Sequence, residues 1–510
     1  MMFTPSLTVG LLPRFVHFRG RRSMSFNPFR RRQTDPARMP PRVTLVQWTL
    51  ASVPVVLSAI TTEVNSYKTL AIITQICAAL SVLLLISVTR EAVRARVVGK
   101  CCLVAGVFVF YWLDAVALTL QPTAFAIREG FPINATLFTQ DLVRQALIYV
   151  SLFQLLVLMG YSIRLRFDRP LAFLASRIDS LSFDRSILGL SLILCAVLPL
   201  ATYYNFDFDK MVAALVASRS FAEFDGPEPG FAQHLAMFGI YGASLFFVYA
   251  LKTSTWRRLG WLFLGAIAAL PFVSAGTRHI WLYISLPSVL IILRGFKGRS
   301  DNYGVIGLAA AVLVVLLVAQ LQFAYRGVGW TELGKAPAAD LSQLNSNGQF
   351  TALLFAEHLV PNEHAYFAEP SEFYFLIHWV PRQLWPEKPV MESWAFYNDS
   401  YVQGAAFNVT PSVIGQFHMS WGLPGVIFIG AWLGFLAMLG DRLLVLLDSN
   451  RQRAMFVVVG MFYAFIISSF RFYSPIYFSY FLFGLVAMFL LTRRRRLRSS
   501  FPLMPERLPA

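Results

Sequence analysis

The chain has 510 residues, of which 56% are hydrophobic and only 14% are charged. A soluble protein of this length needs far more charge to cover its surface, so the composition excludes an ordinary soluble fold and indicates that the bilayer is the solvent. The formal net charge is +17. Because the basic residues gather in the tails and in alternate loops, as the positive-inside rule requires, we predict no nucleic-acid partner.

The N-terminal residues 1–42 form an Arg-rich tail that lacks the apolar core and cleavage site of a signal peptide. Met24 and Met39 are alternative start sites within this tail. The four cysteines lie within or at the ends of apolar segments, and none stands at ligand spacing from a histidine. We therefore predict neither a disulfide nor a metal site.

Apolar stretches long enough to cross about 30 Å of hydrocarbon follow one another along the chain. They begin near Val43, Thr69, Cys101, Val143, Ser186, Phe231, Leu259, His279, Val305, Ile414, Met455 and Pro475. We predict an all-α, polytopic integral membrane protein with about twelve transmembrane helices. The periodic spacing of basic loops between these stretches supports the count independently.

The alternation of basic and neutral loops also predicts the topology. Both termini are expected in the cytoplasm, so that residues 43–492 form a single transmembrane helical domain between basic cytoplasmic tails at 1–42 and 493–510. Two long loops, 204–230 and 325–412, are assigned to the periplasm, the larger between the ninth and tenth helices. The predicted location is the bacterial inner (plasma) membrane, in a multi-pass arrangement.

Four arginines are predicted at or outside the periplasmic face, where the charge rule disfavours basic residues. They are Arg278, Arg326, Arg382 and Arg471, with Arg219 as a weaker fifth candidate. A guanidinium can bind phosphate oxygens through two parallel hydrogen bonds, so we predict that the four arginines bind a diphosphate at the membrane surface. The alternative for each is a contact with lipid headgroups.

Transfer of a glycosyl or acyl group requires a base that takes the proton of the acceptor hydroxyl. The predicted catalytic residues are His378, Glu372 and Asp225, and His279 and Glu357 also qualify by location. For a histidine on an aromatic interfacial helix, a packing role is the plainer alternative.

Asp114 lies inside the third predicted helix, where an ionisable group is costly. Its two interpretations are a functional carboxylate and a structural partner of an arginine such as Arg144. The segment Glu372–Pro389 is aromatic and amphipathic, and we predict an interfacial helix that ends at Pro381 and projects Arg382 from a turn. The sequence contains no Walker loop, HExxH or GxSxG motif, which argues against ATP-driven transport and hydrolysis of the soluble type.

Three segments resemble the oligosaccharide repeat unit polymerases, the Wzy-type O-antigen polymerases. They are SAGTRHIWLY (Ser274–Tyr283), WVPRQLWPEKP (Trp379–Pro389) and NVTPSVIGQFHMSWGLPGVIFIGAWLG (Asn408–Gly434). Members similarly show an arginine turn between helices, a PR-x-LWP-x-KP segment in the large loop and a T-P-S stretch that opens the next helix. Members often carry an acidic residue where this chain has Gln416.

The resemblance implies polymerisation of polyprenyl-diphosphate-linked oligosaccharide units for O-antigen, capsule or exopolysaccharide, without a cofactor or metal. It places Arg278 and Arg382 at family positions, whereas Arg326 and Arg471 follow from topology. A chain-length regulator and a flippase are the implied protein partners, beside membrane lipid. Two alternatives remain open: an O-antigen ligase-like glycosyltransferase and a twelve-helix secondary transporter.

Overall fold

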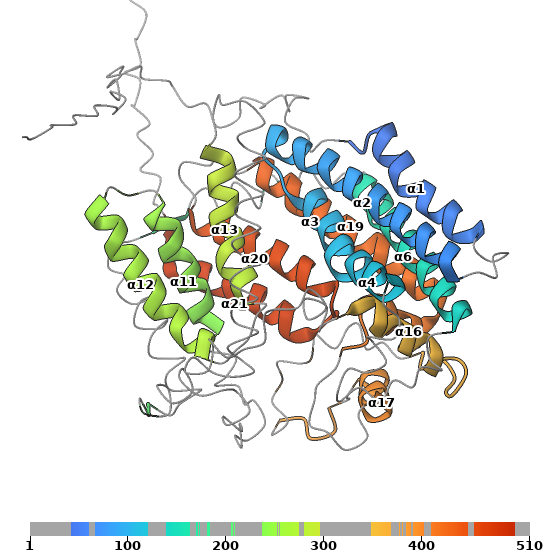
Figure 1. Cartoon of the computed structure of the whole chain (residues 1–510). Coiled ribbons are helices and arrows are strands. Elements are labelled where there is room, and N and C mark those ends of the chain that lie inside the picture. The colour runs from blue at the N-terminus through green and yellow to red at the C-terminus, as the bar shows by residue number, and fades with distance from the viewer. Residues whose placement is uncertain are drawn as a thin grey trace, which may run out of the picture. The chain divides into compact units, whose positions relative to one another are not determined.

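The computed structural model is almost entirely helical in the residues that it describes (Figure 1). These are residues 42–60, 67–120, 139–163, 170, 171, 173, 181–183, 206, 207, 209, 237–251, 253, 255–274, 280–295, 348–368, 377, 380, 384–388, 391–401, 410–446 and 453–494. The first half contains α1 (Leu45–Ile60), α2 (Tyr67–Ala95), α3 (Gly99–Val107), the π-helical turn η3 (Phe108–Trp112), α4 (Leu113–Leu120), α6 (Gln140–Ser162), α11 (Met237–Ala250) and α12 (Thr255–Ser274). The second half contains α13 (Ile280–Gly295), α16 (Gln349–Leu359), α17 (Glu392–Tyr401), α18 (Val413–Trp421), α19 (Leu423–Leu446), α20 (Arg453–Ser469) and α21 (Pro475–Leu491).

The predicted helical class is confirmed, with one local exception. The strands β1 (Leu181–Phe183) and β2 (Thr492–Arg494) pair as a short antiparallel ladder, with Ser182 opposite Arg493. This ladder joins the segment after α6 to the segment after α21. The segment that follows α6 and the segment that follows α21 therefore lie next to each other.

Four helices within the described residues are long and apolar enough to cross a bilayer: Tyr67–Ala95, Gly99–Leu120, Gln140–Ser162 and Leu423–Leu446. Shorter apolar helices accompany them, and together they indicate a membrane protein. A described helix lies at or near ten of the twelve predicted starts, whereas the starts near Ser186 and Val305 fall outside the described residues. The total of about twelve spans remains a prediction.

Glycines allow α6 and α19 to pack with their backbones in contact. Gly430 and Gly434 stand four residues apart on α19, and a Cβ atom added at Gly434 would lie 2.1 Å from the carbonyl oxygen of Val157. On the opposite helix, a Cβ at Gly160 would lie 2.0 Å from the carbonyl oxygen of Ala431. Within a bilayer, helices associate through such close van der Waals contact between small residues, so this seam is a principal contact of the bundle.

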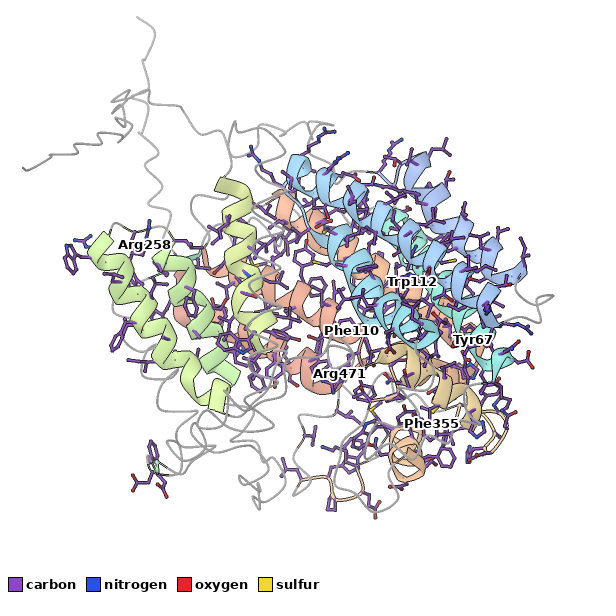
Figure 2. The ribbon with its side chains drawn as sticks, in the orientation of Figure 1. Tyr67, Phe110, Trp112, Arg258, Phe355 and Arg471 are labelled. Atoms are coloured by element: carbon purple, nitrogen blue, oxygen red, sulfur yellow. The ribbon has the colours of Figure 1, made fainter. Side chains whose placement is uncertain are left out.

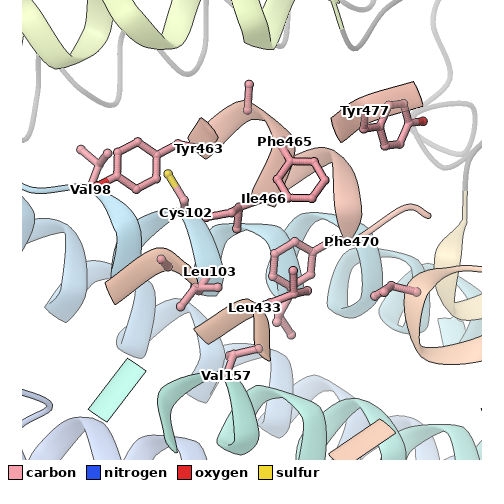
Figure 3. Packing of buried hydrophobic residues seen from close by; sticks show 14 of the residues in the cluster. Val98, Cys102, Leu103, Val157, Leu433, Tyr463, Phe465, Ile466, Phe470 and Tyr477 are labelled. Carbon is pink, nitrogen blue, oxygen red and sulfur yellow. The ribbon is translucent and has the colours of Figure 1, made fainter. Parts of the chain in front are cut away.

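The buried core extends from this seam toward α3 and α20. Leu433 and Val157 are buried together with Phe470, which follows α20 (Figure 3). Close packing also limits the size of neighbouring residues, because a Cβ at Gly106 would lie 2.6 Å from the Phe470 ring. The core thus fixes the end of α20 against α3.

The third predicted helix contains a π-helical turn, η3, between α3 and α4. Such a turn alters the angular position of the residues that follow it, and it often occurs at functional sites. Here it accompanies two buried polar contacts: the Trp112 indole donates to Gln154 at 2.8 Å, and the Tyr111 hydroxyl donates to the Phe470 carbonyl oxygen at 2.9 Å.

The sequence predicted one helix beginning near Ile414, but the structure divides it into α18 and α19. Gly422 separates them with φ +64°, a conformation that glycine adopts without steric cost. A Cβ at Gly425 would lie 2.3 Å from the Phe417 carbonyl oxygen, so α18 folds back on the start of α19. Pro424 stands in the first turn of α19, where its missing N–H is tolerated.

Four helices meet at the carboxylate of Asp441, which is fully buried on α19. It accepts hydrogen bonds from the Gly99 amide at 2.8 Å, from the Tyr161 hydroxyl at 2.6 Å and from the Tyr463 hydroxyl at 2.5 Å. These donors come from α3, α6 and α20. We call this cluster the Asp441 end, and we call the opposite end, formed by Asp114, α16, α18 and residues 470–474, the Arg471 end.

Candidate functional site

The Arg471 end begins with the anchoring of α16 by a buried carboxylate. Asp114, on α4, accepts hydrogen bonds from the Thr351 backbone amide at 2.8 Å and from the Thr351 hydroxyl at 3.2 Å. Thr351 is the third residue of α16, where backbone N–H groups lack helical partners and favour negative charge. A Cβ at Gly348 would lie 2.4 Å from the carboxylate, so a larger residue there would displace the Asp114 side chain. Asp114 therefore caps α16.

Asp114 thus has a structural contact that the sequence did not predict. It accepts hydrogen bonds from Thr351, and Arg144 forms an ion pair with Asp141 at 2.8 Å. The partnership of Asp114 with an arginine stays a prediction. The sequence gives no direct signal of this cap, because 237 positions separate Asp114 from Thr351.

The start of α18 lies against the turn between α20 and α21. The Ser412 hydroxyl caps α18 by accepting from the Gly415 amide at 3.0 Å, and Ser412 itself has φ +63°. The Val413 amide donates to the Phe470 carbonyl oxygen at 3.4 Å. A strained non-glycine residue persists only where its surroundings hold it, and such residues concentrate at functional sites.

Arg471 lies at this junction, half-buried, and its Nε donates to the Thr410 hydroxyl at 3.4 Å (Figure 2). The Tyr111 hydroxyl holds both sides of the junction: it donates to the Phe470 carbonyl oxygen and accepts from the Ile414 amide at 3.4 Å. The predicted T-P-S segment and the predicted arginine are thereby brought together from positions about sixty residues apart.

Gln416 is fully buried on α18, one turn beyond Ser412. Its Oε1 accepts from the Tyr473 amide at 3.0 Å, while its Nε2 has no hydrogen-bond partner within the described residues. The amide therefore links α18 to the segment that carries Arg471.

A second polar group lies at the other end of α18. His418 is buried, and its Nε2 hydrogen-bonds the Val360 carbonyl oxygen at 2.9 Å. Since a carbonyl only accepts, Nε2 carries the proton and Nδ1 is the unprotonated nitrogen of the neutral ring. The rings of Tyr149 and Tyr366 lie against the imidazole, with centroid distances of 5.2 and 5.9 Å.

Glu357 belongs to the same region and is 2% exposed. Neither carboxylate oxygen has a hydrogen-bond partner in the part of the chain that the structure describes. Burial raises the pKa of Glu357 well above its ordinary value. Burial lowers the pKa of His418, partly offset by the hydrogen bond to Val360.

Of the predicted site residues, the structure describes Arg471 and Glu357. The others lie outside the described residues: His378, Glu372, Asp225, Arg278, Arg326, Arg382, His279 and Arg219. The same holds for most of Glu372–Pro389, so the predicted interfacial helix remains a prediction. The sequence did not predict that Glu357 on α16 and His418 on α18 would both lie near Tyr149, because this arrangement depends on how α16 packs on its neighbours.

Within the described residues, no group of three or more His, Cys, Asp or Glu side chains could hold a metal ion. Comparisons of the chain with protein-family models, with curated proteins and with solved structures find no match.

Proposed function

We propose that the chain polymerises lipid-diphosphate-linked oligosaccharide repeat units on the periplasmic face of the bacterial inner membrane. One observation supports the proposal: Arg471, a cation that the topology predicted from the charge rule assigns to that face, hydrogen-bonds Thr410 where the start of α18 meets the segment after α20. The hydroxyl of Thr410 and the guanidinium of Arg471 are suitable donors to a diphosphate. The apolar helices beside them suit a polyprenyl chain.

In the proposed reaction, a hydroxyl oxygen of the acceptor sugar attacks the anomeric carbon of the donor. The bond between that carbon and the diphosphate oxygen breaks, and negative charge develops on the departing diphosphate. Arg471 stabilises this charge without rearrangement because Thr410 already fixes its position. Arg278, Arg326 and Arg382 are proposed as further diphosphate ligands, and His378, Glu372 or Asp225 as the base that accepts the hydroxyl proton.

The proposed topology has about twelve spans, with both termini in the cytoplasm. The β1–β2 ladder supports it, because the ladder joins a segment assigned to a cytoplasmic loop to the start of the C-terminal tail. Reporter fusions after Arg258 and after Arg299 should show a cytoplasmic location, and fusions after Gly226 and after Glu392 a periplasmic one. A cytoplasmic signal after Glu392 would contradict the site assignment.

The direct test uses the full chain in proteoliposomes that contain a polyprenyl-diphosphate-linked oligosaccharide. We expect a ladder of longer products, an Arg471→Ala variant at least about tenfold less active, and poor rescue by Arg471→Lys, which lacks the planar fork. The matched control is Arg258→Ala, because Arg258 is an exposed arginine on α12 away from the Arg471 end (Figure 2). Wild-type chain that forms no product would overturn the proposal.

A deletion strain separates the alternatives. Loss of the polysaccharide ladder with one repeat unit retained is the expected result for a polymerase, whereas loss of both indicates a ligase. Uptake of a solute into vesicles that depends on the protein indicates a transporter.

A further inference from the structure

Glu357 differs from the other buried carboxylates of the described residues in lacking a hydrogen-bond donor. Asp441 has three donors and Asp114 accepts from Thr351, whereas both oxygens of Glu357 are buried and unpartnered. An ionised carboxylate without donors in such a place costs several kcal/mol, even after relaxation. A bound proton removes most of this cost.

Among the described residues, the groups around Glu357 offer no fixed positive charge that would keep it ionised. Tyr149 from α6 interacts electrostatically with Glu357. The ring of Tyr149 lies against the imidazole of His418 from α18, which also contacts Tyr366 from the segment after α16. Next to Glu357, His358 pairs with Glu363 at 3.2 Å on the more exposed side of α16. Asp114 is engaged at the opposite end of α16, and the Arg144 guanidinium pairs with Asp141.

We propose that Glu357 is a proton-binding site of the Arg471 end, that its proton is present at neutral pH, and that this proton keeps α16 closed on α18. The ligand is the proton of the aqueous phase at this end of the protein. The proposal does not depend on the proposed polymerase activity.

The closed arrangement is held by a short row of hydrogen bonds between the segment after α16 and the end of α18. His418 donates to the Val360 carbonyl oxygen at 2.9 Å, while the amides of Phe367 and Ala368 donate to the carbonyl oxygens of Met419 and Ser420 at 3.1 and 2.8 Å. We call the segment Val360–Ala368 the strap. The strap closes over the end of α16 and satisfies the last carbonyl groups of α18.

Release of the proton requires this row to open. The O–H bond of Glu357 then breaks, the proton passes to water, and the carboxylate that remains is stabilised by the water that enters. Because one proton is released with each opening, the opening constant rises about tenfold per pH unit between the pKa of the exposed carboxyl and that of the buried one. Closing the strap takes up one proton in return.

The first test is infrared difference spectroscopy of the full chain in lipid. We expect the C=O stretching band of a protonated carboxylic acid at neutral pH, and its loss in Glu357→Gln. The matched control is Glu91→Gln, because Glu91 forms an ion pair with Lys100 at 2.7 Å, away from Glu357, so the band should remain. A band that is absent from the wild type, or unchanged in Glu357→Gln, overturns the proposal.

The second test measures hydrogen exchange of the Phe367 and Ala368 amides against pH. After correction for intrinsic exchange, the wild type should show the tenfold rise per pH unit, and Glu357→Gln, which cannot ionise, should show none. If Glu357→Gln does not fold, Glu357→Met provides the same uncharged comparison. Equal pH slopes in the wild type and in a folded variant would refute the link between the proton and the strap.

Discussion

Asp441 and Glu357 are both buried carboxyl groups in a protein with few charges, yet their surroundings are opposite. Asp441 receives hydrogen bonds from α3, α6 and α20, so its charge is shared among three fixed donors. Glu357 lies between α16 and its neighbours without a donor from any described residue. Burial alone therefore does not define the role of a carboxyl group. A buried carboxyl group with hydrogen-bond donors connects the helices that supply them, whereas one without donors is a proton-binding site.

The largest effect is expected from removal of the Asp441 carboxylate. Asp441→Ala leaves the Gly99 amide and the hydroxyls of Tyr161 and Tyr463 without an acceptor, and each orphaned donor costs about 1–3 kcal/mol. We expect a loss of at least about 3 kcal/mol in the free energy of unfolding. Thermal unfolding of the purified chain measures it. An unfolding midpoint equal to that of the wild type would contradict the structural role of Asp441.

The next largest effect is expected at the contact between α6 and α19, which connects the Asp441 end with the Arg471 end. Gly434→Ala places a methyl group against the Val157 carbonyl. The helix α6 contributes Tyr161 to the Asp441 end, and its middle contributes Tyr149 to the Arg471 end. Overpacking of this kind costs roughly 1–3 kcal/mol. The same unfolding measurement checks it, with Gly260→Ala as the control, because a Cβ at Gly260 meets nothing within 4 Å. Similar changes in the free energy of unfolding for the two substitutions would show that α6 and α19 can move apart without loss of stability.

A smaller effect, confined to the Arg471 end, is expected from Tyr111→Phe. The substitution removes a hydroxyl that donates to the Phe470 carbonyl and accepts from the Ile414 amide, at a cost of about 1–2 kcal/mol. Because the bridge aligns Arg471 with Thr410, activity should fall through weaker donor binding. Tyr463→Phe serves as control, since it removes a buried hydroxyl at the Asp441 end. Equal losses of donor affinity in both variants would argue against a positioning role for Tyr111.

The smallest effect at neutral pH is expected from Glu357→Gln, which replaces a neutral acid by a neutral amide. The informative quantity is the pH dependence of stability. Burial raises the pKa of Glu357, so the folded state holds a proton that the unfolded state releases, and stability falls as pH rises from the ordinary carboxyl range toward the folded pKa. Glu357→Gln should remove this decline.

The lowered pKa of His418 has the opposite sign. The unfolded imidazole binds a proton before the folded one does, so this group reduces stability as pH falls below its ordinary pKa. A His418→Phe variant should lose this decrease in stability at low pH. The decrease in stability with rising pH that Glu357 causes should persist. Unfolding midpoints measured across pH for both variants separate the two contributions, and identical profiles would contradict this assignment.

Part of the candidate site could be predicted from the sequence. The charge rule selected Arg471 as a cation out of place, and the T-P-S stretch marked the start of a helix, which Ser412 does cap. The division at Gly422 also had a local signal, since glycine followed by proline two positions later favours the end of one helix and the start of another. These features depend on neighbouring residues, which a sequence displays directly.

By itself, the sequence determined that the chain is helical and apolar, because the length and hydrophobicity of each segment are local properties. Only the tertiary structure decided which carboxyl group receives donors. Asp441 lies 342 positions from Gly99 and 280 from Tyr161, and Asp114 lies 237 positions from Thr351. No local pattern encodes such distances. The state of a buried charge depends on the groups that packing brings around it, so Asp441 and Glu357 acquire different roles only in the folded bundle.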